Sequence, residues 1–195
     1  MSSREAILKR VTANKPAGPP LPATLAFEPL PADALIEKYV RIAEAVGTVV
    51  MQVENLSAIG AYLKKHYETP ERVLNTVKGV GFGQELSGPI EDGHTLANLE
   101  MAVVQGTLAV AENGAVWVSE EHLPIRVLPF ITEHLMLVVS EKDVVNNMHE
   151  AYARLDVSVP GFGAFISGPS RTADIEQSLV IGAHGPKRAH VFLVK

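Results

Sequence analysis

The residues best suited to chemistry lie in one segment, residues 167–186, which reads SGPSRTADIEQSLVIGAHGP. Ser170 and Thr172 carry hydroxyl donors, and the guanidinium of Arg171 between them presents a rigid fork of N–H groups that suits a carboxylate or a phosphate. Ser167 and Gly168 lead into this group through a tight turn. These five residues are our candidate ligands for a small anion.

A strand and a helix must position these donors. GAFIS (163–167) is typical of a strand, and DIEQSLVIG (174–182) of a helix whose first turn pairs Asp174 with Gln177 in a capping box. Free backbone N–H groups and the positive end of the helix dipole would favour an anion there. In the alternative interpretation, the polar residues only cap the helix and Arg171 pairs with a nearby acid.

Further polar candidates come from a predicted hairpin and from a late turn. TLAVA (107–111) and AVWVS (115–119) flank Glu-Asn-Gly, and Asn-Gly between apolar runs is the strongest short-range hairpin signal. Glu112 is a candidate catalytic base or hydroxyl acceptor, and Asn113 could face the same crevice as the anion-binding segment. His184 could line that crevice too. The simpler alternatives are a polar residue in a turn and an imidazole near helix carbonyls.

The pattern G-F-G-x-x-x-S-G-P occurs twice, as GFGQELSGP (81–89) and GFGAFISGP (161–169). The likeness does not extend beyond these nine residues, so no internal duplication is supported. The first copy runs into an acidic Ile-Glu-Asp and the second into Ser-Arg-Thr, which favours one site and one accident. GVGFGQ (79–84) lacks the dinucleotide-binding spacing, and predicts either a glycine-rich loop over a substrate pocket or a plain surface loop.

Composition narrows the class of protein. The chain has 195 residues and a net charge of −5, which argues against a nucleic-acid surface. No apolar run is long enough to span a membrane, the first residues do not resemble a signal peptide, and a cytoplasmic location is expected. There is no cysteine, which excludes a thiol nucleophile or a Cys-ligated iron–sulfur cluster in this chain. The seven histidines show no metal-binding spacing, so no metal is expected.

The predicted elements divide the chain at residue 31. Residues 2–14 are predicted to form a helix, and six of the thirteen prolines fall between Pro16 and Pro31. We therefore expect an N-terminal helix and an extended arm over 1–31, the arm being a linker or a segment that packs on a partner, followed by one domain over 32–195.

The domain is expected to have an α/β fold. Helices are predicted at 33–46, 55–67 and 141–155, and strands at 48–53, 72–77, 134–140 and 190–194. This alternation indicates a layered, mostly parallel sheet with flanking helices and one inserted β-hairpin.

The segment SGPSRTADIEQSLVIGAHGP closely resembles the C-terminal signature of the lactate-utilization (LUD) domain family, and in particular its single-domain, LutC-like branch. GTLAVAENGAVWV is similar to a strand–turn–strand segment of that family, although Asn113 and Ala115 replace the expected Thr. The resemblance covers roughly residues 30–195.

The resemblance implies a fold similar to that of NagB, RpiA and the CoA transferases. It also implies a role in oxidising L-lactate to pyruvate beside partner proteins that carry the iron–sulfur clusters, with no cofactor in this chain. Two alternatives stay open: a stand-alone enzyme acting on a small acyl or anionic substrate, related in fold to the 5-formyltetrahydrofolate cyclo-ligases, and a metabolite-sensing module.

Overall fold

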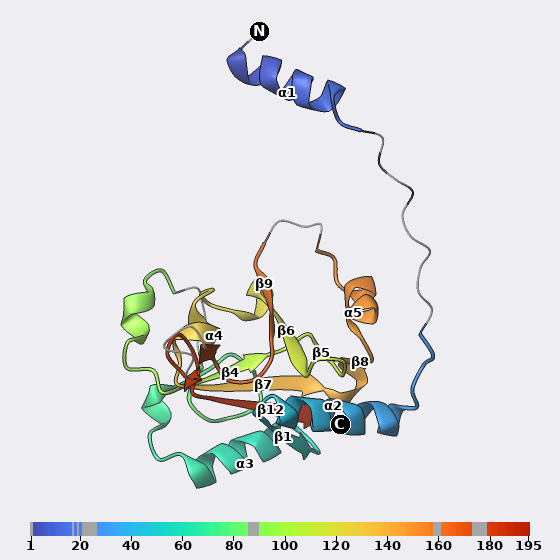
Figure 1. The fold of residues 1–195 in the computed structure, drawn as a ribbon. Coiled ribbons are helices and arrows are strands. Elements are labelled where there is room, and N and C mark those ends of the chain that lie inside the picture. Colours follow the sequence, from blue (N-terminus) through green and yellow to red (C-terminus); the bar gives the residue numbers. More distant parts are fainter. Residues whose placement is uncertain are drawn as a thin grey trace.

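The structure, a computed structural model, describes residues 2–16, 18, 20, 27–85, 90–157, 161–172 and 179–195. Its body contains two main sheets with helices around them, and α1 (Ser3–Ala13) lies apart from both sheets (Figure 1). Among the described residues, no helix combines the length and apolar character needed to cross a membrane. Within the same ranges, no cluster of three or more His, Asp or Glu side chains is placed to hold a metal ion.

The central sheet has six strands in the order β1-β12-β7-β4-β2-β3, and every pairing in it is parallel. Its strands are β1 (Thr48–Val53), β2 (Val73–Asn75), β3 (Gln84–Glu85), β4 (Met101–Gln105), β7 (His134–Ser140) and β12 (Arg188–Val194). Both faces of the middle strands are covered, which is why HLMLVV in β7 is almost continuously apolar rather than alternating.

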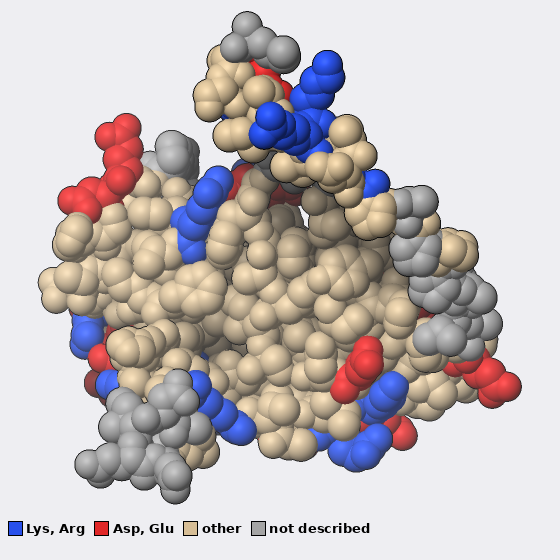
Figure 2. Space-filling view, turned by 45° about the horizontal axis from the view of Figure 1, so that its top comes forward, with Lys and Arg blue, Asp and Glu red and all other residues tan. Residues whose placement is uncertain are grey.

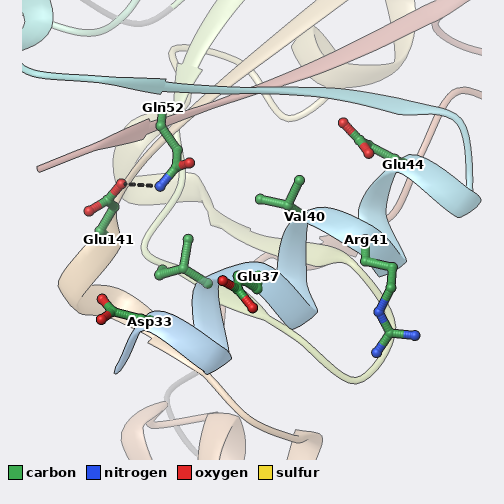
Figure 3. A pocket seen from close by; sticks show the side chains of 8 residues that line it. Asp33, Glu37, Val40, Arg41, Glu44, Gln52 and Glu141 are labelled. Carbon is green, nitrogen blue, oxygen red and sulfur yellow. Dashed lines mark hydrogen bonds between the residues drawn. The ribbon is translucent and has the colours of Figure 1, made fainter. Parts of the chain in front are cut away.

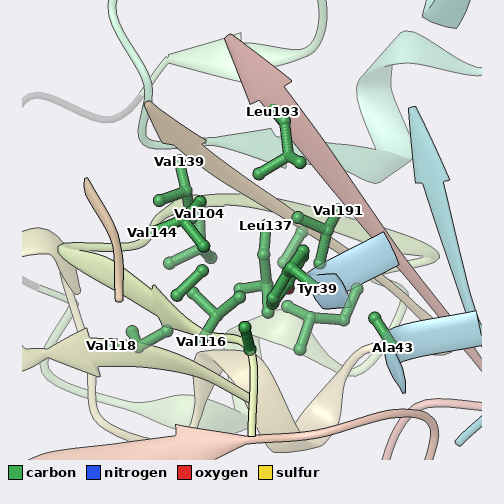
Figure 4. Packing of buried hydrophobic residues seen from close by; sticks show 14 of the residues in the cluster. Tyr39, Ala43, Val104, Val116, Val118, Leu137, Val139, Val144, Val191 and Leu193 are labelled. Atoms are coloured by element: carbon green, nitrogen blue, oxygen red, sulfur yellow. The ribbon is translucent and has the colours of Figure 1, made fainter. Parts of the chain in front are cut away.

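One face of this sheet packs against α3 (Leu56–His66), the helix predicted at 55–67, whose N-cap is Asn55. The core on this side joins Ile59 and Leu63 of α3 to Met136 and Phe192 of the sheet. The other face packs against α2 (Ala32–Ala45), whose Tyr39 and Ala43 are fully buried (Figure 4).

A second, four-stranded sheet closes the α2 side in the order β8-β5-β6-β9. It consists of β5 (Leu108–Val110), β6 (Ala115–Ser119), β8 (Val144–Val145) and β9 (Gly163–Ile166). The predicted hairpin is confirmed as the antiparallel pair β5–β6, but it belongs to this second sheet rather than lying within the parallel one. Val116 and Val118 of β6 share a core with Val139 of β7 and Val191 of β12 (Figure 4).

Shorter elements complete the fold. They are η1 (Pro70–Arg72), η2 (Gly93–Leu96), η3 (Glu120–His122), α4 (Leu128–Ile131), η4 (Glu141–Asp143), α5 (Met148–Arg154), β10 (Arg171–Thr172) and β11 (Val180–Ile181). The small β10–β11 pair is antiparallel.

Two predicted helices need correction. The helix predicted at 141–155 is α-helical only over Met148–Arg154. Glu141–Asp143 form the 3-10 turn η4, Val144 and Val145 form β8 beside β5, and Asn147 caps the helix that follows. The helix predicted at 174–182 is wrong at Val180–Ile181, which pair with β10 as a strand. Residues 173–178, with the predicted capping box, lie outside the described residues. Strand β4, at 101–105, was not predicted.

Candidate functional site

A crevice of about 610 Å³ lies at the carboxyl ends of the parallel strands. Its lining includes Thr76 directly after β2, Gln105 at the end of β4 and Ser140 at the end of β7. Open parallel sheets bind ligands at this edge, because the loops that leave neighbouring strands gather there. The crevice is therefore the candidate site that the fold itself provides.

The lining of the crevice is suited to a small anion. Lys78 and Lys195 contribute two ammonium groups against one carboxylate, Asp143, and His122 lies at the same edge. Lys195 is already paired with Glu54, at 2.5 Å. Among the described residues, by contrast, no hydrogen bond or ion pair engages the exposed ammonium of Lys78. Lys78 is therefore the cation in this lining that is available to a ligand.

The loop that follows Lys78 has a backbone conformation that depends on glycines. Gly79, Gly81 and Gly83 have φ of +93°, +68° and +85°, a backbone region that favours glycine. Val80 and Phe82 alternate with them and are buried. The glycine-rich loop follows Lys78 directly but contributes no residue to the crevice lining, and its two apolar side chains anchor it to the core.

This loop also lies unusually close to α3. A Cβ atom added at Gly60 would lie 1.9 Å from the carbonyl oxygen of Val80, so only glycine permits this approach. Gly106 plays a similar part on the floor of the crevice, where an added Cβ would meet Val116 at 2.3 Å. Two glycines thus permit close contacts between segments far apart in the sequence, and one of them, Gly106, lies in the crevice lining.

Arg171, the predicted anion ligand, is engaged by the backbone. Its Nη2 donates to the carbonyl oxygen of Val46 at 2.5 Å, at the C-terminal end of α2, where a cation is favourable to the helix dipole. Gly168 packs on the same carbonyl, since an added Cβ would lie 2.5 Å from that oxygen. These contacts give Arg171 and Gly168 a capping role at α2, and anion binding by Arg171 stays a prediction.

The rest of the predicted segment lies around this contact. Ser170 holds the segment through its backbone, which donates to Pro186 and accepts from Gly182, both at 2.9 Å. Thr172 lies in β10, and His184 is exposed in the bend before β12. None of the predicted ligands is among the residues that line the crevice at the sheet edge.

The hairpin turn and the predicted segment do meet. The hydroxyl of Ser167 donates to the carbonyl oxygen of Asn113 at 2.7 Å. Glu112 faces elsewhere: its Oε2 accepts from the backbone N–H of Met148 at 2.8 Å, at the start of α5. A carboxylate there is favourable to the helix dipole, so this contact supports the structural interpretation of Glu112.

Sequence reasoning did not identify the crevice residues. They are Thr76, Lys78, Gln105, Thr107, His122, Ser140 and Asp143. The signal that could have found them is positional, because polar residues directly follow the apolar runs of β2, β4 and β7. Using that signal required β4, which had not been recognised as a strand.

A buried histidine lies near the amino ends of the parallel strands, at the opposite end of the sheet from the crevice. His190 of β12 is 7% exposed, and its Nδ1 has no hydrogen-bond partner among the described residues. The pKa of His190 is lowered to about 4, chiefly by burial and to a lesser extent by the nearby His134 and Arg188. Burial also lowers the pKa of His134, whose Nδ1 lies 3.3 Å from the hydroxyl of Tyr67. This end of the sheet therefore favours neutral imidazoles.

Comparison with known proteins shows which sequences this chain resembles. The sequence profile of the LUD domain matches residues 90–194, which run from just before β4 to the end of β12. The chain is 35% identical over 99 residues to lactate utilization protein C of Bacillus pumilus, covering 48% of this chain and 41% of that protein. It is 34% identical over 109 residues to lactate utilization protein C of Geobacillus thermodenitrificans, covering 53% and 45%. The match thus spans less than half the length of these relatives.

A solved structure supports the architecture. The crystal structure of a DUF162 family protein from Deinococcus radiodurans superposes with a TM-score of 0.67. The match covers 86% of this chain and 100% of that one, at 17% sequence identity. At that identity the likeness concerns the fold alone, and it confirms the layered α/β architecture with a parallel sheet.

Proposed function

This chain belongs to the LUD domain family, and we propose on that premise that it is a component of a system that oxidises L-lactate to pyruvate. The observation that carries the proposal is the likeness to two proteins named lactate utilization protein C. The family match includes three strands of the parallel sheet, β4, β7 and β12, so it contains much of the edge that forms the crevice.

We propose further that the crevice binds a small carboxylate such as lactate or pyruvate. Lys78 would supply the charge, and Gln105 and Thr107 would supply hydrogen bonds from the adjacent strand end. Lysine serves here as a point charge on a flexible stem, which suits a ligand that carries only one carboxylate. The electrons would pass to iron–sulfur clusters in partner proteins, since this chain contains no cysteine.

A binding experiment tests the crevice. Isothermal titration with L-lactate and pyruvate compares the wild type with Lys78→Ala, which should lose about 1–3 kcal/mol of binding free energy if the ammonium makes a charge-assisted contact. Arg171→Ala is the matched control, because it also removes one exposed cation but lies at the end of α2. Loss of binding in Arg171→Ala alone would place the ligand at the segment predicted from sequence.

A reconstitution experiment tests the role. The purified chain should not oxidise lactate alone, and activity should appear only when cluster-bearing partners are added. Turnover by the isolated chain would replace the component role with that of a stand-alone enzyme. Thermal stabilisation by lactate or pyruvate, with no partner captured and no turnover, would favour a metabolite-sensing module.

A further inference from the structure

A second groove, of about 550 Å³, runs along the exposed face of α2 (Figure 3). Ile36 and Val40 provide its apolar side chains. Four carboxylates and one guanidinium also line it, from Asp33, Glu37, Glu44, Glu141 and Arg41. Gln52 of β1 closes one wall by donating to Glu141 at 2.9 Å. This groove, called the acidic groove below, combines an apolar strip with a net negative lining.

Helix α1 has the complementary character. Ile7, Leu8 and Val11 are 59%, 50% and 62% exposed, and α1 buries no residue. Their spacing of one, three and four residues places them on one side of the helix. Lys and Arg side chains gather on α1 in Figure 2. The sequence of α1 contains three cationic residues and one carboxylate, Glu5. That carboxylate is used in the capping box with Ser2.

The two surfaces match in length. The groove residues of α2 run from Asp33 to Glu44, and α1 runs from Ser3 to Ala13. At a rise of about 1.5 Å per residue, each extends for roughly 16 Å. An isolated helix shorter than about 12–15 residues is marginal in water, so α1 needs a surface that buries its apolar side.

The described end of the arm lies near α5, none of whose residues lines the groove. The ring of Phe27 lies 5.1 Å from that of His149 on α5, whereas β1 and η4 form the other wall of the groove. The six prolines between residues 16 and 31 favour an extended chain, which works against a tight return to the same α2. These features favour a groove on another molecule.

We propose that α1 of each chain docks in the acidic groove of a second copy, so that two chains exchange their arms in a symmetric dimer. Ile7, Leu8 and Val11 would cover Ile36 and Val40, and the cations of α1 would face the carboxylates of the rim. The exchange is isologous, because each copy gives one helix and receives one. The inference does not depend on the proposed lactate role.

Cysteine cross-linking tests the exchange directly, because the wild-type chain has no cysteine. One chain carries Leu8→Cys, and a second chain with a tag of different mass carries Val40→Cys. Both positions are near the middle of their helices, so they meet in either helix orientation. Disulfide-linked heterodimers should form rapidly on mild oxidation. A control chain with Glu71→Cys, which is exposed away from the groove, should link far more slowly.

Two outcomes of the cross-linking overturn the proposal. One is linkage to Glu71→Cys at the same rate as to Val40→Cys. The other is a double Leu8→Cys/Val40→Cys chain that closes only within itself, which would mean that α1 occupies the groove of its own chain.

Solution mass gives an independent test. The wild type should be a dimer that weakens at high salt, and Glu37→Lys/Glu44→Lys should be monomeric. Val11→Asp should also dissociate it, whereas Ala13→Asp on the opposite side of α1 should not. A monomeric wild type, or a dimer unaffected by Val11→Asp, overturns the proposal. Because Val11 and Ala13 are exposed, neither change threatens the fold of the body.

Discussion

The two Gly-Phe-Gly segments have identical letters but need their glycines for different reasons. In residues 81–83, both glycines have positive φ, which lets the loop after β2 turn back on itself while Phe82 is buried. In residues 161–163, neither glycine has positive φ, and their role is to leave room for neighbouring side chains. The same motif therefore reflects backbone conformation in one region and close packing in the other, which agrees with the absence of any internal duplication.

Among substitutions that test this difference, the largest loss of stability is expected in the second segment, at Gly163. A Cβ there would lie 2.1 Å from the ring of Trp117, so Gly163→Ala must displace either the ring or β9. We expect a loss of about 3 kcal/mol in unfolding free energy, at the upper end for overpacking, measured by urea denaturation. In a Trp117→Leu background the same change should have a much smaller effect. If Trp117→Leu brings no relief, packing is not the reason for this glycine.

The next effect is expected in the first segment, at Gly83. Alanine there would combine a φ of +85° with an approach of 2.9 Å to the carbonyl oxygen of Val73. Gly83→Ala should lower stability by about 2 kcal/mol. Val73→Ala removes only the side-chain part of this contact, so it should relieve little of the loss. Full relief by Val73→Ala would show that the backbone conformation is unimportant.

Acid should affect the parallel sheet, which carries the first segment, more than the second sheet. The folded pKa of His190, about 4, lies below its ordinary value of 6.5, so the unfolded chain binds more protons between these values. Stability should therefore be unaffected above pH 6.5 and decline as the pH falls toward 4. The expected loss is on the order of 2 kcal/mol after allowance for solvent screening.

Hydrogen exchange at pH 5 and 7 measures where this acid effect falls. Amides of β12 and β7 should lose more protection at pH 5 than those of β5 and β6. His190→Leu should flatten the pH dependence of stability, and His184→Asn, at an exposed position, should not. An unchanged pH dependence in His190→Leu would locate the titrating group elsewhere.

The smallest losses of stability are expected at Gly81 and Gly161, the first glycines of the two copies. At Gly81 an added Cβ meets nothing within 4 Å, so Gly81→Ala should reveal backbone strain alone, about 1 kcal/mol. At Gly161 the Cβ would meet the flexible end of Glu120, which can move away, so Gly161→Ala should lose about 0.5 kcal/mol or less. Thermal unfolding of both variants checks this order, and the reverse order would refute the distinction between the two copies.

Much of the fold was predictable because local signals were strong. The helical apolar pattern at 55–67 and Asn-Gly between two apolar runs have direct structural meaning, and both predictions are confirmed. The prediction of a helix over 141–155 was wrong although the apolar residues have helical spacing. Val144 and Val145 are β-branched and favour a strand, and Asn147 favours a helix start rather than a helix interior. There a neighbouring strand, β5, decided the conformation.

The candidate site was less predictable than the fold. Arg171 looked like a ligand because its chemistry suits anions, yet its nearest acceptor is a carbonyl 125 positions earlier in the chain. Lys78 was not predicted as a ligand because a single lysine beside glycines has no distinctive sequence signature. It becomes a candidate only because Gln105 and Ser140, which belong to other strands, line the same crevice.

By itself, the sequence determined the class of fold, most of the helices and strands of the body, the family resemblance and the absence of thiol chemistry. These follow from apolar periodicity, turn residues and composition, which act over a few neighbouring positions. Only the tertiary structure decided which polar groups meet, that Arg171 caps α2, and that the hairpin belongs to a second sheet. Those outcomes depend on the order of strands and on close approaches such as that of Gly60 to Val80, which bring together residues distant in sequence.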